Sequence, residues 1–365
     1  MPQLSLYKKS CRIAILSLIA LSGVSAQSQS TPAQDTSQAP ASEAASAPVV
    51  VGNLSSKDLA PKTVEDWSTP SLKGSQLVFG DTLVAEVYKN NPAYTREFIA
   101  TQWRVADPID LYVIKPTGVE KPPVILYLYS YPFELDHFRD DAFCQFLVRN
   151  GVAAVGFPSA LTGLRYHAPR PMKQWFVSEL QESMATSAHD VQMILDYLDK
   201  RGDLDMSRVG MFGDGSGASI AILAAAVDPR IKSLDLLDPW GDWPDWIAKS
   251  TLVPENERPD YLKPEWLARV APLDPVKWLP TLKDRNVRIQ FVSSVTVTPD
   301  EAKKKVEAAA PSNAKIIHYA DAKAFKIANA SGTGFDWIKE QVAGKSPKAD
   351  GDLHSQNPLA RRSEQ

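Results

Sequence analysis

The feature that most restricts the fold of this chain is a glycine-spaced turn between two apolar runs. Residues 209–212 (VGMF) form a short apolar run, which is typical of a buried strand. The turn GDGSG at 213–217 follows, and the alanine-rich run ASIAILAAAV at 218–227 has the composition of a buried helix. The sequence therefore predicts a strand that turns sharply into a buried helix.

Strand and helix patterns alternate through the middle of the chain. A long helix is expected over 179–200, with Val191, Ile194, Leu195 and Leu198 on one face at helical spacing. This alternation predicts an α/β fold with a mostly parallel central sheet and helices on both faces. Further strands are expected at 97–103, 109–114, 124–129, 152–157, 231–237, 287–292 and 315–319, and further helices at 141–150, 300–310 and 334–342.

The first 26 residues have the three parts of a secretory signal peptide. Basic residues at 8–12 precede an apolar core at 13–21, and Val24-Ser25-Ala26 offers a small-residue cleavage site. The apolar core is shorter than the roughly 20 residues that a spanning helix needs, although an uncleaved anchor is the alternative. We expect residues 1–26 to be removed and the protein to be exported, to the periplasm or out of the cell.

The segments that flank the domain are polar and of low complexity. Residues 27–50 consist mostly of Ser, Ala, Gln and Pro, and residues 344–365 are polar and rich in turn-forming residues. We expect a disordered linker and a disordered tail around one domain at 51–343.

Composition excludes several classes of function. The net charge of −3 becomes −6 once the three cations of the signal peptide are removed, which argues against binding to nucleic acid. No metal-ligand spacing and no phosphate-binding loop occurs in the sequence, so we expect neither a metal nor a cofactor. No membrane span is expected after signal cleavage. Cys144 is then the one cysteine left, and a buried structural role is favoured for it over a reactive thiol.

Several phrases together resemble the α/β-hydrolase family over roughly 97–342. VILYLY at 124–129, followed by Ser130 and Tyr131, looks like that family's third strand and oxyanion loop. The turn at 213–217 resembles the nucleophile elbow, and APLDP at 271–275 resembles the approach to a late strand that precedes the catalytic acid. The resemblance implies an α/β-hydrolase fold of the esterase or peptidase type.

The same resemblance implies that the catalytic triad is degenerate. The family needs serine, carboxylate and histidine in that chain order. The elbow motif G-x-S-x-G here reads Gly213-x-Gly215-x-Gly217, so Gly215 stands at the nucleophile's place. Ser294 falls at the place of the acid and Ala324 at that of the histidine. These positions predict a non-catalytic or strongly impaired relative that binds a small or apolar ligand.

An active serine hydrolase is the alternative. Ser216 follows the elbow apex and could act with His137 or His167 as an unconventional base. Against this, Ser216 suits a helix N-terminus as a capping residue, and Asp214 suits the positive end of the helix dipole. A noncovalent enzyme such as a lyase in the same pocket is a third hypothesis. The remaining histidines are placed in structural or tail positions: His189, His318 and His354.

A tryptophan-rich segment follows the strand at 231–237. Trp240, Trp243 and Trp246 stand within seven residues, in a region of about 238–270 that corresponds to the cap insertion of the family. Their rings either line a ligand site or bury the cap against the sheet. On the first alternative, the residues expected to bind the ligand are Tyr131, Gly215, Trp240 and Trp243.

Overall fold

A computed structural model describes residues 65–80, 82–104, 107–131, 135–162, 165 and 175–344. The predicted signal peptide, the predicted linker and the predicted tail beyond Gly344 lie outside these residues, as do His167 and His354.

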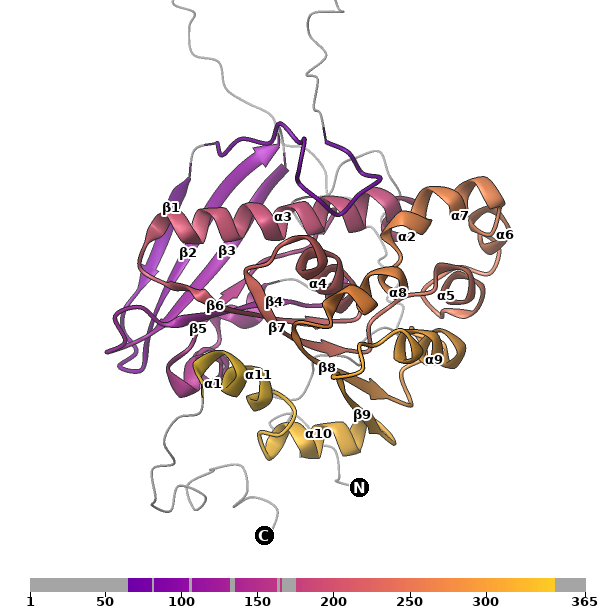
Figure 1. Ribbon diagram of the computed structural model, residues 1–365. Coiled ribbons are helices and arrows are strands. Elements are labelled where there is room, and N and C mark those ends of the chain that lie inside the picture. Colours follow the sequence, from indigo (N-terminus) through magenta and orange to yellow (C-terminus); the bar gives the residue numbers. More distant parts are fainter. Residues whose placement is uncertain are drawn as a thin grey trace, which may run out of the picture. The chain divides into compact units, whose positions relative to one another are not determined.

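The described residues form a nine-stranded sheet with the order β1-β2-β3-β5-β4-β6-β7-β8-β9 (Figure 1). Every pairing from β5 through β9 is parallel, whereas β1, β2, β3 and β5 pair antiparallel with one another. The predicted, mostly parallel sheet is thus confirmed. Its strands are β1 (Leu83–Tyr88), β2 (Tyr94–Arg104), β3 (Asp107–Pro116), β4 (Pro123–Leu128), β5 (Ala153–Gly156), β6 (Asp205–Asp214), β7 (Ile231–Leu237), β8 (Asn286–Val292) and β9 (Lys315–Tyr319).

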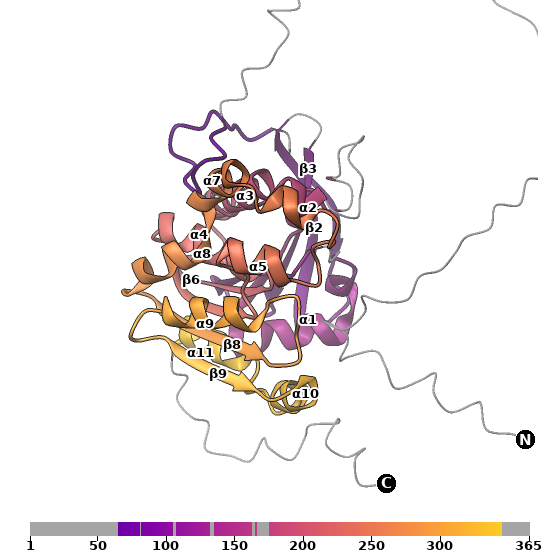
Figure 2. The same ribbon diagram turned by 90° about the vertical axis from the view of Figure 1, so that its right-hand side faces the viewer.

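Helices cover both faces of the sheet, as predicted (Figures 1 and 2). α1 (Asp141–Val148) and α11 (Asp336–Ala343) pack on one face, and α3 (Leu180–Arg201) and α4 (Ser216–Val227) pack on the other. Two glycines of strand β6 contact helices on opposite faces of the sheet. A Cβ on Gly210 would lie 2.6 Å from Val342 in α11, whereas Gly213 lies against α4. Because both faces are covered, β4 is apolar throughout rather than alternating, and all six of its residues are buried.

Short helices fill the connection between β7 and β8, where the cap was predicted. α5, α6 and α7 lie within about 238–270, and α8 follows before β8. No helix of the described part of the chain has both the length and the apolar composition for crossing a bilayer. The remaining helices are α2 (Trp175–Ser178), α5 (Trp243–Lys249), α6 (Arg258–Tyr261), α7 (Pro264–Val270), α8 (Pro275–Trp278), α9 (Asp300–Ala308) and α10 (Ala322–Ala330), together with short 3₁₀ helices of which η1 (Asp136–Arg139) matters below.

Candidate functional site

The turn between β6 and α4 has the backbone of a nucleophile elbow. Gly215 is the single residue between the two elements and adopts φ 54° and ψ −116°. Its N–H donates a hydrogen bond of 2.9 Å to the carbonyl of Leu237 in β7, which ties the turn to the neighbouring strand. A residue with a side chain is strained at this φ, and the strain is characteristic of this turn when it carries a serine. Here glycine adopts it without steric cost.

The space beside Gly215 is filled by side chains from two other connections. A Cβ at this position would overlap the Ser130 hydroxyl and would lie 2.9 Å from Ser130 Cβ and 3.1 Å from Trp240 Nε1. Ser130 follows β4, and Trp240 follows β7. The place where a nucleophile's side chain would project is therefore taken up by Ser130 and Trp240.

Ser216 is the first residue of α4 and is completely buried. Its hydroxyl oxygen accepts a hydrogen bond of 2.9 Å from the backbone N–H of Tyr131. This bond ties the segment after β4 to the start of α4. The structure thus brings together Tyr131 of the predicted oxyanion loop and Ser216 of the predicted elbow. A nucleophilic role for Ser216 remains a prediction, and the hydrogen bond described here gives the side chain a structural role.

We expect Ser216→Ala to lower the free energy of unfolding by about 1 kcal/mol, because the Tyr131 N–H loses its acceptor in a buried environment. Urea titration followed by tryptophan fluorescence measures the loss. Ser219→Ala is a poor control because Ser219 also bonds to Trp240, whereas the exposed Ser293→Ala at the end of β8 is expected to change stability by less than about 0.5 kcal/mol. Equal stability of Ser216→Ala and wild type would mean that the hydroxyl contributes nothing to the turn.

His137 lies in η1 and is surrounded by aromatic rings. Its ring centroid is 4.7 Å from that of Tyr129, 4.3 Å from that of Phe138 and 5.1 Å from that of Phe143. The hydrogen bond of Ser216 goes to Tyr131 rather than to His137. The two residues of the predicted alternative pair are therefore not joined as nucleophile and base in this structure. The other predicted base, His167, lies outside the described residues.

Two buried carboxylates flank the turn. Asp214 is the last residue of β6 and is 9% exposed. Burial, with a smaller contribution from the nearby Asp238, raises its pKa to about 8. Asp238 follows β7 at a positive φ of 43°. Burial raises its pKa to about 6, although it accepts a 3.0 Å hydrogen bond from the Val292 N–H and lies 3.9 Å from Lys303 Nζ.

Asp214 is consequently protonated in large part at neutral pH. The predicted pairing of its negative charge with the dipole of α4 is weak for that reason. The described residues contain no group of three or more His, Cys, Asp or Glu side chains that could hold a metal ion.

The residues at the places of the catalytic acid and the histidine lie in the segments that follow β8 and β9. Ser294 is exposed in the turn after β8. Ala324 lies in the first turn of α10, a helix that was not predicted, and its N–H donates to the Asp321 side chain at 2.8 Å. The signal for this helix was present in the sequence, because Asp321 is a typical N-cap residue.

The tryptophans of the 238–246 segment form a buried stack. Trp240 and Trp243 are each 1% exposed and Trp246 is fully buried. The rings of Trp240 and Trp246 stack at 4.7 Å, and Phe176 meets Trp240 edge-on at 5.8 Å. The burial of all three rings favours the second alternative, in which they pack in the interior of the protein. Neither Trp240 nor Trp243 presents a ring face to solvent, so their ligand binding stays a prediction.

No protein-family model matches this sequence, and no curated protein matches it either. Solved structures do resemble it. The acetyl xylan esterase from Paenibacillus sp. R4 superposes with a TM-score of 0.53 at 15% identity, over 66% of this chain and 82% of that one. The S-formylglutathione hydrolase from Agrobacterium tumefaciens gives 0.53 at 13% identity, over 71% of this chain and 99% of that one.

The 2,6-dihydroxy-pseudo-oxynicotine hydrolase gives a TM-score of 0.52 at 17% identity, over 70% of each chain. Sequence identities this low carry information about architecture alone, and the architecture agrees with the sheet order and the turn described above. This chain therefore has the α/β-hydrolase fold.

Proposed function

We propose that this chain is an exported protein of α/β-hydrolase fold that has lost the hydrolytic reaction and binds a small molecule without consuming it. The observation that carries the proposal is the occupied space at Gly215. A nucleophile is absent there, and Ser130 and Trp240 fill the volume that its side chain would need.

The other two triad places support the same proposal. A serine nucleophile needs a base to take its proton and a carboxylate to orient that base. The residues at those places are Ala324, which has no titratable group, and Ser294, which has no charge at neutral pH. Restoring one group alone therefore restores no triad.

Covalent labelling with a fluorophosphonate probe tests the proposal. We expect no labelling and no turnover of p-nitrophenyl acetate, p-nitrophenyl octanoate, acetylated xylan or S-formylglutathione, the last two being chosen from the names of the structural neighbours. An active serine esterase serves as the positive control for the probe, and heat-denatured protein as the negative control.

Variants distinguish the ways in which the proposal could be wrong. Labelling that disappears in Ser216→Ala would establish the alternative hydrolase with Ser216 as nucleophile. Labelling that disappears in Ser130→Ala instead would place a nucleophile on the segment after β4. Either result overturns the non-catalytic proposal.

A further inference from the structure

The segment 65–72, which precedes β1, lies against helix α3 and is held there by two side chains of that helix. Gln192 donates from Nε2 to the Pro70 carbonyl at 2.8 Å, and its Oε1 accepts from the Leu72 N–H at 3.0 Å. His189 stands one turn earlier on the helix and is fully buried. The described polar contacts of this segment with α3 therefore converge on two residues that are three positions apart.

Both ring nitrogens of His189 face oxygen atoms of the segment. Nδ1 lies 2.7 Å from Glu65 Oε1, and Nε2 lies 3.0 Å from the carbonyl oxygen of Thr69. A carbonyl oxygen only accepts, so Nε2 must carry a proton. A neutral imidazole has no second proton, and its Nδ1 lone pair would then face the carboxyl group. Both bonds form only when the ring is an imidazolium or when Glu65 carries the other proton.

Glu65 is ionised and cannot supply that proton. Arg104 donates from Nε and Nη2 to its two carboxylate oxygens, at 2.6 Å and 2.5 Å. Burial raises the pKa of Glu65, but the hydrogen bonds from Arg104 and His189 outweigh burial and hold the pKa below its usual value. The neighbouring Asp66 is exposed and adds a negative field that water screens. The donor at Nδ1 is therefore the histidine.

The buried charges next to His189 balance only when its ring is positive. Arg104 in β2 also donates to Asp190 in α3. Asp190 lies 2.8 Å from Arg165 Nη2, and Arg165 donates from Nε and Nη2 to Asp107 in β3, each at 2.8 Å. With Glu65, the cluster contains three carboxylates and two guanidinium groups. A protonated His189 neutralises it, whereas a neutral ring leaves an uncompensated negative charge in the interior, which is costly.

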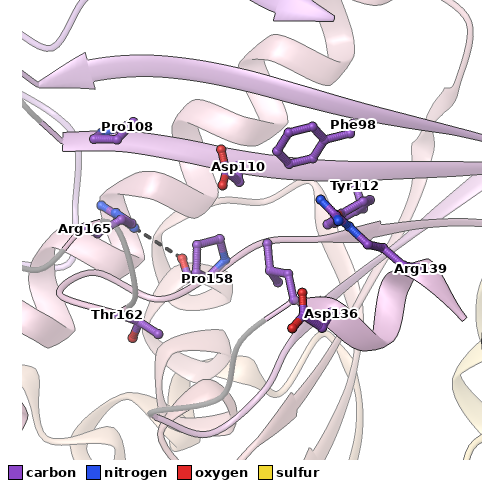
Figure 3. A pocket seen from close by; sticks show the side chains of 10 residues that line it. Phe98, Pro108, Asp110, Tyr112, Asp136, Arg139, Pro158, Thr162 and Arg165 are labelled. Carbon is purple, nitrogen blue, oxygen red and sulfur yellow. Dashed lines mark hydrogen bonds between the residues drawn. The ribbon is translucent and has the colours of Figure 1, made fainter. Parts of the chain in front are cut away.

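Arg165 is fixed in place and cannot shift to replace a charge lost at His189. Its Nη1 donates to the Pro158 carbonyl at 3.2 Å, the bond drawn in Figure 3, while its other nitrogens hold the two aspartates. On its other side it lines a cavity of 160 Å³, together with Phe98, Asp110 and Tyr112 (Figure 3). Histidine is the residue type in this cluster whose charge changes near neutral pH.

We propose that His189 is an imidazolium in the folded protein and acts as a proton-dependent clasp, which fastens the segment 65–72 to α3 and loosens as the pH rises above neutral. Once the segment is released, the ring meets water and titrates as an ordinary histidine, near pH 6.5. The docked form holds a proton that the released form gives up above this pH. Docking is therefore fully stabilised below about pH 6.5 and weakens as the pH rises. This inference does not depend on the proposed function, because none of these residues belongs to the glycine turn.

Two-bond ¹H–¹⁵N NMR spectra of the ¹⁵N-labelled protein at pH 7 test the protonation state directly. The signals of His189 are identified as those that are missing in His189→Gln, or that shift in Glu65→Gln should the first variant fold poorly. We expect two ring nitrogens of similar chemical shift, the pattern of an imidazolium. One protonated and one bare nitrogen at this pH would overturn the proposal.

Hydrogen exchange read by mass spectrometry tests the release of the segment. Peptides that cover residues 65–79 contain the Leu72 amide that donates to Gln192. One proton permits at most about a tenfold change for each pH unit, and we expect the protection factor, corrected for the intrinsic exchange rate, to fall at least about tenfold from pH 6.5 to pH 8.5. A protection factor that stays constant over this interval would contradict the clasp.

Glu65→Gln separates the clasp from other effects of pH. Its side-chain amide can donate to Nδ1 of a neutral ring, so both bonds of His189 persist without the second proton. We expect its protection factor to change by less than about twofold over the same interval. His318→Gln, at an exposed residue of β9, is the control and should show the same fall as the wild type. All three proteins retain Asp214, so their differences exclude its titration. An equal fall in Glu65→Gln and the wild type would assign the pH dependence to another group and overturn the proposal.

Discussion

Gly215→Ser is expected to give no esterase activity and to lower the free energy of unfolding by about 4 kcal/mol. A side chain at φ 54° costs about 1–3 kcal/mol in backbone strain. Crowding against Ser130 and Trp240 adds about 1–3 kcal/mol, since a packed interior accepts extra atoms only by shifting its neighbours. Urea unfolding measures the stability, and hydrolysis of p-nitrophenyl acetate measures the activity.

A matched pair of alanine variants separates strain from crowding. Gly118 also has a positive φ, of 81°, but a Cβ there meets no atom within 4 Å. Gly118→Ala should therefore cost only the strain, about 1 kcal/mol, and Gly215→Ala should cost clearly more. In the double variant Ser130→Gly/Gly215→Ser, removal of the Ser130 side chain should recover part of the loss.

Two outcomes would contradict this account of the turn. Equal losses in Gly118→Ala and Gly215→Ala would mean that the space beside Gly215 is open. Substantial ester hydrolysis by Gly215→Ser would mean that a working base stands close to the turn and that Ala324 has been wrongly identified with its place.

The fold could be predicted from the sequence because its central strands and helices are marked by local patterns. The expected strands at 231–237 and 315–319 coincide with β7 and β9, and the expected helix at 179–200 differs from α3 by one residue at each end. Burial on both faces makes the central strand β4 continuously apolar, and its segment shows this pattern by itself. Strand β1 was not predicted, because five of its six residues are exposed and it carries no such pattern.

The site was predictable only in part. The glycine at the elbow can be identified from the sequence alone, because it concerns the identity of a single residue. What occupies the space beside it depends on how Ser130 and Trp240 pack against Gly215, and these residues are distant in the sequence. The burial of Trp240 and Trp243 was left open for the same reason. No local sequence motif marks the pocket that Phe98, Asp110 and Tyr112 line, because its walls come from two strands, a 3₁₀ helix and a loop.

Asp214→Asn is expected to remove much of a stability loss that the wild-type protein suffers between about pH 5 and about pH 8. In the folded protein the pKa of Asp214 is raised to about 8, whereas in the unfolded chain it returns to the ordinary value near 3.8. Between these values the native state holds a proton that the unfolded chain releases. Raising the pH therefore favours unfolding across this interval.

The size of the effect follows from the same shift. Each pKa unit corresponds to about 1.4 kcal/mol, so the complete interval sets an upper bound of about 6 kcal/mol. Relaxation around a newly ionised carboxylate makes the actual loss of stability smaller than this bound. Between about pH 5 and about pH 8, we expect the free energy of unfolding of the wild type to fall by about 3 kcal/mol more than that of Asp214→Asn. Asp238, whose pKa is raised to about 6, adds a smaller decline in stability with rising pH, and both proteins share this decline.

Asp203→Asn provides the control of opposite sign. Hydrogen bonds from Arg201 hold the pKa of Asp203 far below its usual range, with a further contribution from Lys115. Its stabilising effect is lost only as the pH falls into the acid range, so this variant should be less stable than wild type by a constant amount from about pH 5 to about pH 8. A pH profile of Asp214→Asn that runs parallel to the wild type in the same way would mean that Asp214 is ionised in the folded protein. The turn would then carry a buried negative charge beside Gly215, a further electrostatic obstacle to any oxyanion formed there.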